Sequence, residues 1–183
     1  ARLKHSLFVR NCWFYGRGLT AFYTEAMNNC YITDNQFQRL NIGIHYKYGS
    51  AAYREDLEDV VISNNEFSYM DKQAIRLENP TTGDEFIRKT IISNNTIEEA
   101  DFLNAGEPAV YIQNGQNVSF LNNVVSQTGA GNSVVFEDGK QNHISDNHIL
   151  ECGINDQGEH EGLVFLNENR TIVNDNFIRT YVD

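Results

Sequence analysis

A short phrase that recurs along the whole chain constrains the fold more than any other feature. It consists of an apolar residue, two mostly polar residues, an asparagine, one variable residue and another apolar residue. Clear copies are ITDNQF, ISNNEF, ISNNTI, FLNNVV, ISDNHI and VNDNFI, after a degenerate first copy, VRNCWF. The fourth position holds, in order, Cys12, Asn35, Asn65, Asn95, Asn123, Asn147 and Asn176. The intervals of 23, 30, 30, 28, 24 and 29 residues are typical of solenoid repeats.

A second phrase follows the first six copies, and in it apolar residues alternate with variable ones. Its copies are GLTAFY, GIHYKY, AIRLEN, AVYIQN, SVVFED and GLVFLN. A period of two is the pattern of a β-strand, and no stretch has a sustained helical period. Each repeat is therefore predicted to contribute three short strands: one before the asparagine, one after it and one in the second phrase.

Asparagine accounts for 23 of the 183 residues, whereas proline occurs only twice. Asparagine tolerates the left-handed backbone conformation that a sharp corner between two strands requires. Its amide can also bond to an equivalent asparagine one coil away, at the strand spacing of about 4.8 Å. We therefore expect the recurring asparagines to occupy left-handed corners and to form a ladder.

The apolar-S-N-N-x-apolar phrase followed by G/A-I-x-L resembles the PbH1 repeat of right-handed parallel β-helix proteins, the pectate-lyase-like superfamily. The resemblance covers essentially all seven copies. It implies an all-β fold, a right-handed single-stranded parallel β-helix of about six to seven coils with an Asn ladder. Residues 1–183 are interpreted as a single β-helix domain and, since the chain has no initial Met, as an excerpt of a longer chain.

The charge balance limits the partners. The chain has 14 basic and 25 acidic residues, a net charge of −11, which disfavours nonspecific binding to nucleic acid or to an anionic membrane. No apolar stretch approaches the length of about eighteen residues that a membrane span needs. The sequence thus predicts neither a nucleic-acid nor a membrane partner, and the resemblance alone implies an extracellular or cell-surface location.

The second-phrase strands are expected to form the floor of a carbohydrate groove, as they do in the family that the chain resembles. If their apolar residues face the core, the alternating neighbours face outward. One predicted outward column contains Thr20, His45, Arg76, Tyr111, Val135 and Val164. The other contains Phe22, Lys47, Glu78, Gln113, Glu137 and Leu166.

These columns supply the groups for chemistry beside a uronate carboxylate, which requires a cation, a base and an acid. Arg76 or Lys47 is predicted to neutralise the carboxylate. His45 or Lys47 would abstract the C5 proton, and Tyr111 would protonate the leaving oxygen. The predicted substrate-binding residues are Glu78, Gln113, Glu137 and Phe22. The leading hypothesis is a polysaccharide lyase or C5 epimerase, although no catalytic phrase of a known subfamily is present.

Two alternatives stay open at this stage. A noncatalytic β-helix, such as a tailspike, adhesin or surface segment, fits the acidity and the missing catalytic phrase. A glycoside hydrolase would use Glu78 and Glu137, two coils apart. Their backbone separation of about 9.6 Å lies near the upper edge of the inverting range.

The negative net charge would repel a polyuronate unless the groove is locally cationic or Ca²⁺ bridges protein and sugar. Glu78, Glu137 and Asp138 are candidate Ca²⁺ ligands, but no calcium-binding motif is present and no resident metal is predicted. Residues 177–183 end in strand character without a capping helix. We therefore expect a further stretch of β-helix, or a second copy of the chain, to cover this end.

Overall fold

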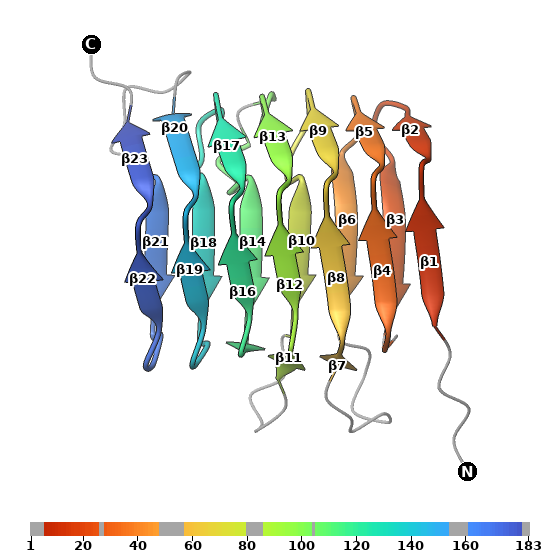
Figure 1. Cartoon of the computed structure of the whole chain (residues 1–183). Coiled ribbons are helices and arrows are strands. Elements are labelled where there is room, and N and C mark those ends of the chain that lie inside the picture. Colours follow the sequence, from red (N-terminus) through yellow and green to blue (C-terminus); the bar gives the residue numbers. More distant parts are fainter. Residues whose placement is uncertain are drawn as a thin grey trace.

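The computed structural model describes residues 6–25, 28–47, 57–79, 86–103, 105–153 and 161–180. Over these residues the chain forms β-strands and no helix, and the paired strands are all parallel. The coils pass in turn through three long sheets, which we call A, B and C, so that strands from successive coils lie side by side (Figure 1). The predicted all-β parallel β-helix is confirmed.

The strands group into three long sheets and a short one. Sheet A contains β1 (Leu7–Arg10), β4 (Cys30–Thr33), β8 (Val60–Ser63), β12 (Ile91–Ser93), β16 (Ser119–Leu121), β19 (His143–Ser145) and β22 (Ile172–Asn174). Sheet B contains β2 (Trp13–Tyr15), β5 (Gln36–Gln38), β9 (Glu66–Ser68), β13 (Thr96–Glu98), β17 (Val124–Ser126), β20 (His148–Cys152) and β23 (Phe177–Thr180). Sheet C contains β3 (Thr20–Glu25), β6 (Ile42–Lys47), β10 (Ile75–Glu78), β14 (Val110–Gln113), β18 (Val134–Glu137) and β21 (Leu163–Leu166). The short sheet D contains β7 (Leu57–Glu58), β11 (Ile87–Arg88) and β15 (Gly115–Gln116).

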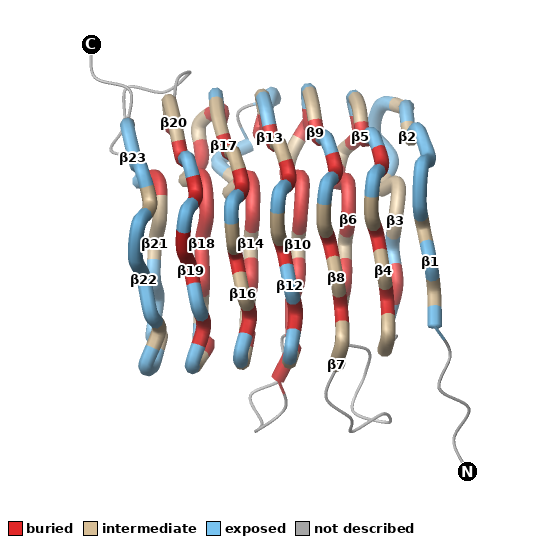
Figure 2. Tube along the Cα trace, viewed as in Figure 1, coloured by how far each residue is buried: buried red, intermediate tan, exposed pale blue. Residues whose placement is uncertain are grey.

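Buried residues recur on each of the middle coils (Figure 2). Inside the coil, like residues stack from one coil to the next. In sheet B the rings of Phe14, Phe37 and Phe67 stack nearly parallel, with centroids 4.9 and 4.7 Å apart. In sheet A, Ile32 is paired with Val9 on one side and Ile62 on the other. In-register stacking follows from the repeat because each coil places an apolar residue at the same inward position.

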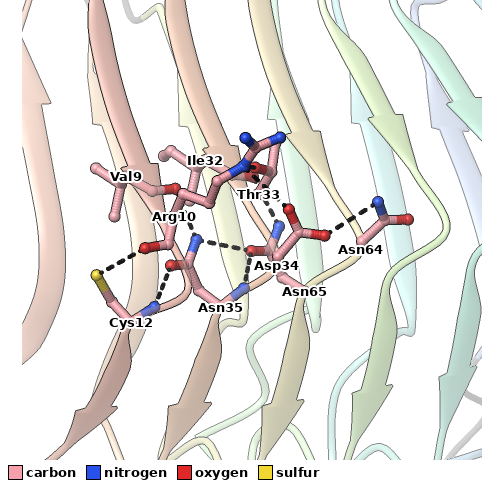
Figure 3. Close-up of polar contacts among 9 residues, drawn as sticks. All are labelled: Val9, Arg10, Cys12, Ile32, Thr33, Asp34, Asn35, Asn64 and Asn65. Atoms are coloured by element: carbon pink, nitrogen blue, oxygen red, sulfur yellow. Dashed lines mark hydrogen bonds and ion pairs between the residues drawn. The ribbon is translucent and has the colours of Figure 1, made fainter.

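The predicted Asn ladder runs along the corner between sheets A and B. The Oδ1 atom of Asn65 accepts hydrogen bonds from the backbone and side-chain amides of Asn35, both at 3.0 Å. The Nδ2 atom of Asn65 donates to the Ile32 carbonyl oxygen at 2.9 Å. The pattern continues along the coils to Asn176, and it starts at the Cys12 amide (Figure 3). The ladder therefore satisfies buried polar groups at every corner that it crosses.

The expected left-handed conformation occurs one residue earlier than predicted. The residue that precedes each ladder position has a positive φ, for example Asp34 at 59° and Asn64 at 55°, whereas the ladder asparagines do not. Different residues form the ladder and the left-handed corner, because a ladder side chain must point inward to meet its neighbours. The preceding Asn or Asp makes the corner, where its short polar side chain tolerates the left-handed region.

Gly43 allows β6 to pass close to its neighbouring coil. A Cβ atom there would lie 2.7 Å from the Ala74 carbonyl oxygen and 2.8 Å from the Phe67 ring. Such contacts are too short for any side chain, so glycine is required for this close approach. Gly43 thereby fixes the start of the strand that carries His45 and Lys47.

The last described coil leaves part of its inner surface exposed. Phe165, Val173 and Ile178 lie at core positions and yet are 37%, 46% and 44% exposed. The predicted covering of this end by more β-helix or by a second copy stays a prediction. In the described part of the chain, no helix has the length and apolar character needed to cross a membrane.

Candidate functional site on the outer face of sheet C

Strands β6 and β10 bring four predicted site residues together on the outer face of sheet C. Arg76 pairs with His45, and Glu78 pairs with Lys47, in the parallel register that the alternation predicts. The intervening Ile75 and Leu77 are buried in the core. The predicted outward placement of these side chains is therefore confirmed.

Glu78 is the centre of this cluster. Its Oε1 atom lies 3.0 Å from His45 Nε2 and 3.4 Å from Lys47 Nζ. Its Oε2 atom accepts hydrogen bonds from Arg76 Nε at 2.8 Å and Nη2 at 2.7 Å. Only 9% of the Glu78 side chain is exposed, whereas Lys47 is 40% exposed. We call His45, Lys47, Arg76 and Glu78 the Glu78 cluster.

The neighbours of Glu78 keep its carboxylate ionised. Burial raises the pKa of Glu78, but the hydrogen bonds and charges of His45 and Arg76 outweigh it and leave the pKa lowered. The carboxylate is therefore ionised at neutral pH and can only accept hydrogen bonds. His45 must donate from Nε2, so in the neutral imidazole the Nδ1 atom carries a free lone pair. The arrangement holds a base in a defined tautomer.

Tyr111 occupies the next strand, β14, beside Arg76. The Arg76 guanidinium lies over the Tyr111 ring, 5.6 Å from its centroid. The Tyr111 hydroxyl donates a short hydrogen bond to Glu137. Burial, followed by this hydrogen bond, raises the pKa of Tyr111 well above its usual range. Tyr111 therefore keeps its proton at neutral pH. Gln113 is half-buried and pairs with Glu137 in the adjacent strand.

The predicted register of the first coil was wrong by three residues, an odd shift that exchanges inward and outward positions. Phe22 aligns with Ile44 and packs against the core, so it does not lie in the outward column with Lys47. Tyr23 and Glu25 take the outward positions, and the Tyr23 hydroxyl donates a short hydrogen bond to Glu25. The phrase GLTAFY had been aligned by its glycine, whereas β3 continues to Glu25. The charge of Glu25 was the signal that could have corrected the register.

Tyr23 extends the cluster by one coil. Its ring makes an edge contact with the His45 imidazole, with centroids 5.1 Å apart, and half of the side chain is exposed. The hydrogen bond to Glu25, followed by burial, raises the pKa of Tyr23. The face of sheet C thus carries a Tyr–Glu pair on each side of the Glu78 cluster.

The chain belongs to the NosD family. The sequence model of this family, described as "Periplasmic copper-binding protein (NosD)", matches residues 10–183. A comparison with curated protein sequences gave no match.

Two solved structures are similar to this chain. The enzymatically active domain of tailspike protein 2 from bacteriophage CBA120 has a TM-score of 0.51 at 13% identity, with 85% of this chain and 27% of that chain covered. The A-module of the mannuronan C-5 epimerase AlgE4 from Azotobacter vinelandii has a TM-score of 0.48 at 14% identity, with 97% and 58% covered. This chain therefore spans less than two thirds of either protein.

The described residues do not fit a copper centre. Copper in proteins is bound by imidazole and sulfur ligands gathered at one point. Among the described residues, no three His, Cys, Asp or Glu side chains are grouped so that they could hold a metal ion. Burial raises the pKa of the Cys30 thiol to about 11, which disfavours the thiolate that a metal requires. His45 is bound to Glu78, and the Glu78 oxygens are occupied by cations.

Proposed function

We propose that the outer face of sheet C binds a uronate-containing polysaccharide and catalyses proton abstraction at C5, leading to β-elimination or C5 epimerisation. The observation that carries this proposal is the contact of one buried carboxylate, Glu78, with His45, Lys47 and Arg76. Such a carboxylate orients an imidazole and keeps a nearby cationic surface in place, which is the preorganisation that carbanion chemistry needs.

The proposed roles follow from the free atoms of the cluster. His45 Nδ1 takes the C5 proton, and the Lys47 ammonium, the most exposed cation of the cluster, neutralises the uronate carboxylate as charge develops on it. In elimination, the C5–H electron pair forms the C4–C5 double bond while the C4–O bond breaks. Tyr111 then supplies a proton to the departing oxygen. In epimerisation, Tyr111 instead supplies a proton to C5 on the opposite face, and the C4–O bond stays intact.

Arg76 and Glu78 have positioning roles in this proposal. Two nitrogens of Arg76, Nε and Nη2, contact Glu78, and its guanidinium group lies over the Tyr111 ring. Arg76 therefore connects the carboxylate that orients the proposed base, His45, to the proposed acid, Tyr111. This assignment differs from the sequence-based expectation that Arg76 meets the substrate carboxylate directly, because its charge is already paired with Glu78.

The acidic surroundings restrict how a polyuronate could bind. Glu25 and Glu137 flank the Glu78 cluster, and the whole chain has a net charge of −11. We propose that Lys47 provides the local attraction, with Ca²⁺ between Glu137 and the sugar as the second means. Glu78 is unsuited to bind Ca²⁺ because its two oxygens already contact cationic side chains. Parallel assays with Ca²⁺ and with EDTA distinguish attraction by Lys47 from Ca²⁺ bridging, because EDTA abolishes only the second.

The fold is compatible with this proposal without specifying the reaction. The family description supports a location outside the cytoplasm, in the periplasm or beyond it. The tailspike domain with the same fold is described as enzymatically active. A β-helix supports many activities, so the substrate class rests on the side chains of sheet C.

The hydrolase alternative loses support from the geometry. It needs one carboxylic acid that is protonated at working pH, whereas the pKa of Glu78 is lowered. The other candidate, Glu137, accepts the hydrogen bond from Tyr111. The noncatalytic alternative is an outcome of the experiment that follows.

The test is a paired assay on alginate, pectate and glycosaminoglycans, each with Ca²⁺ and with EDTA. Ultraviolet absorbance of the unsaturated product detects elimination, and deuterium incorporation at C5 in D₂O detects epimerisation. We expect one of the two signals, and its loss in His45→Asn. His143→Asn is the matched control because His143 is an exposed histidine on sheet A. Absence of both signals on every polymer, with binding retained, would leave the noncatalytic β-helix.

A further inference from the structure

A shallow pocket of about 100 Å³ lies on sheet B, away from the Glu78 cluster. It spans strands β2, β5 and β9, and two outward columns run through it. One column consists of Trp13, Gln36 and Glu66, and the other of Tyr15, Gln38 and Ser68. The pocket is lined by Trp13, Gln36, Phe37, Gln38, Glu66 and Ser68. We call it the Trp13 pocket.

The aromatic wall of this pocket is open. Trp13 is 68% exposed and Tyr15 is 59% exposed. Their rings meet edge to face, with centroids 6.0 Å apart and an interplanar angle of 61°, so the contact covers neither ring face completely. On sheet A, in contrast, Phe8 stacks flat on Tyr31 at 4.9 Å and 8°. The Trp13 indole beside the pocket is thus exposed over the part of the chain that the structure describes.

The remaining walls carry hydrogen-bonding groups. Gln36 Nε2 donates to Glu66 Oε2 at 3.3 Å, and both side chains are exposed. Gln38 and Ser68 add an amide and a hydroxyl in the second column. Planar amides and carboxylates beside an aromatic face match a pyranose ring, which presents C–H groups on one face and hydroxyls around its edge.

We propose that the Trp13 pocket binds a neutral hexose unit of a polysaccharide. The ring would stack on Trp13, while its hydroxyls bond to Gln36, Gln38 and Glu66. A neutral sugar is favoured over an anionic one because Glu66 lines the pocket and the chain carries a net charge of −11. This inference does not rest on the reaction proposed for sheet C, since no residue of the Glu78 cluster contributes to the pocket.

The single tryptophan of the chain makes the test direct. Cellohexaose, mannohexaose and maltohexaose are titrated separately into the protein while Trp13 emission is recorded. At least one is expected to shift or quench the emission in a saturable way. Gln36→Ala should weaken that binding about tenfold through lost hydrogen bonds. Gln127→Ala is the matched control because Gln127 is an exposed glutamine directly after β17, two coils beyond β9.

Three results would overturn the inference. They are no response to any of the three oligosaccharides, equal affinity of Gln36→Ala and the parent protein, and an emission that changes with protein concentration alone, as a self-association surface would produce. Affinity electrophoresis of Trp13→Ala in gels that contain the responding glycan gives a second readout. His45→Asn should keep the full fluorescence response, so failure of the sheet C proposal and failure of this one are distinguishable.

Discussion

The Asn ladder and the Glu78 cluster are both buried polar networks, but the first recurs on successive coils and the second occurs on one stretch of sheet C. Each ladder asparagine bonds to its counterparts at nearly constant distances, for example 3.0 Å from Asn65 to Asn95 and from Asn95 to Asn123. Glu78 instead contacts three different side chains, the His45 imidazole, the Lys47 ammonium and the Arg76 guanidinium. A polar group that recurs with the repeat serves the fold, whereas one that interrupts the repeat marks a site.

The largest loss of protein stability is expected when an asparagine is replaced in the middle of the Asn ladder. Asn95→Ala removes the acceptor of the Asn65 backbone and side-chain amides and the donor to the Ile62 carbonyl. Because these groups stay buried, we expect the free energy of unfolding to fall by about 3 kcal/mol. Urea denaturation checks this value. Asn174→Ala, an exposed asparagine on sheet A, should change it by less than about 0.5 kcal/mol. Equal effects would show that the ladder has no special role.

The next largest effect is expected at Glu78. Glu78→Gln leaves the cations of Lys47 and Arg76 around a neutral amide, and we expect a loss of about 2 kcal/mol, below the range for fully buried pairs because Lys47 and Arg76 are partly exposed. Urea denaturation of both proteins measures the loss. Activity should also disappear on any polymer that gives a signal in the assay proposed above. A variant with unchanged stability but no activity would mean that the cluster serves the reaction alone.

The cost of Glu78→Gln should depend on pH in one direction. The pKa of Glu78 is lowered in the folded protein, so its stabilisation is complete above the unfolded value of about 4.3 and is lost as the pH falls through the folded value. The unfolding free energies of parent and variant should converge between about pH 5 and pH 3. Parallel urea titrations over this interval test the convergence. A constant difference would contradict the lowered pKa. The ladder variant Asn95→Ala should show no such convergence, because amides do not titrate.

The smallest effect on stability is expected for Tyr111→Phe. This change removes the hydroxyl that donates to Glu137 but keeps the ring under Arg76, so we expect a loss of less than about 1 kcal/mol. If Tyr111 protonates the leaving group, elimination should slow by about 100-fold or more. Substrates with a better leaving group should recover much of that rate. A slow variant without such recovery would assign Tyr111 to positioning.

Much of the fold was predictable because it is periodic. The spacing of Asn35, Asn65 and Asn95 identified the coil, and the alternation in IRLE correctly placed Arg76 and Glu78 outward. Periodicity failed where a coil departs from the repeat. In the first coil, β3 continues past the phrase, so Phe22 turned inward and Tyr23 took the outward position. The left-handed corner was likewise misplaced by one residue, because sequence alone does not separate Asp34 from Asn35.

The candidate site was only partly predictable. Sequence gathered His45, Lys47, Arg76 and Glu78 on one face, since strand alternation and coil length determine which side chains share a surface. It treated Arg76 as a free cation and Glu78 as a substrate ligand, because the pairing of neighbouring side chains depends on distances of a few ångströms. The Trp13 pocket was not predicted, for the same reason.

The sequence by itself determined the repeat, the coil, the ladder and the outward columns beyond the first coil, because each depends on a period that local residue types specify. Only the tertiary structure decided that Glu78 is enclosed by His45, Lys47 and Arg76 and that Trp13 lies exposed beside Gln36. These features arise where residues some 30 positions apart in the chain become neighbours across the coils. Charge pairing and exposure depend on that neighbourhood, so no local pattern encodes them.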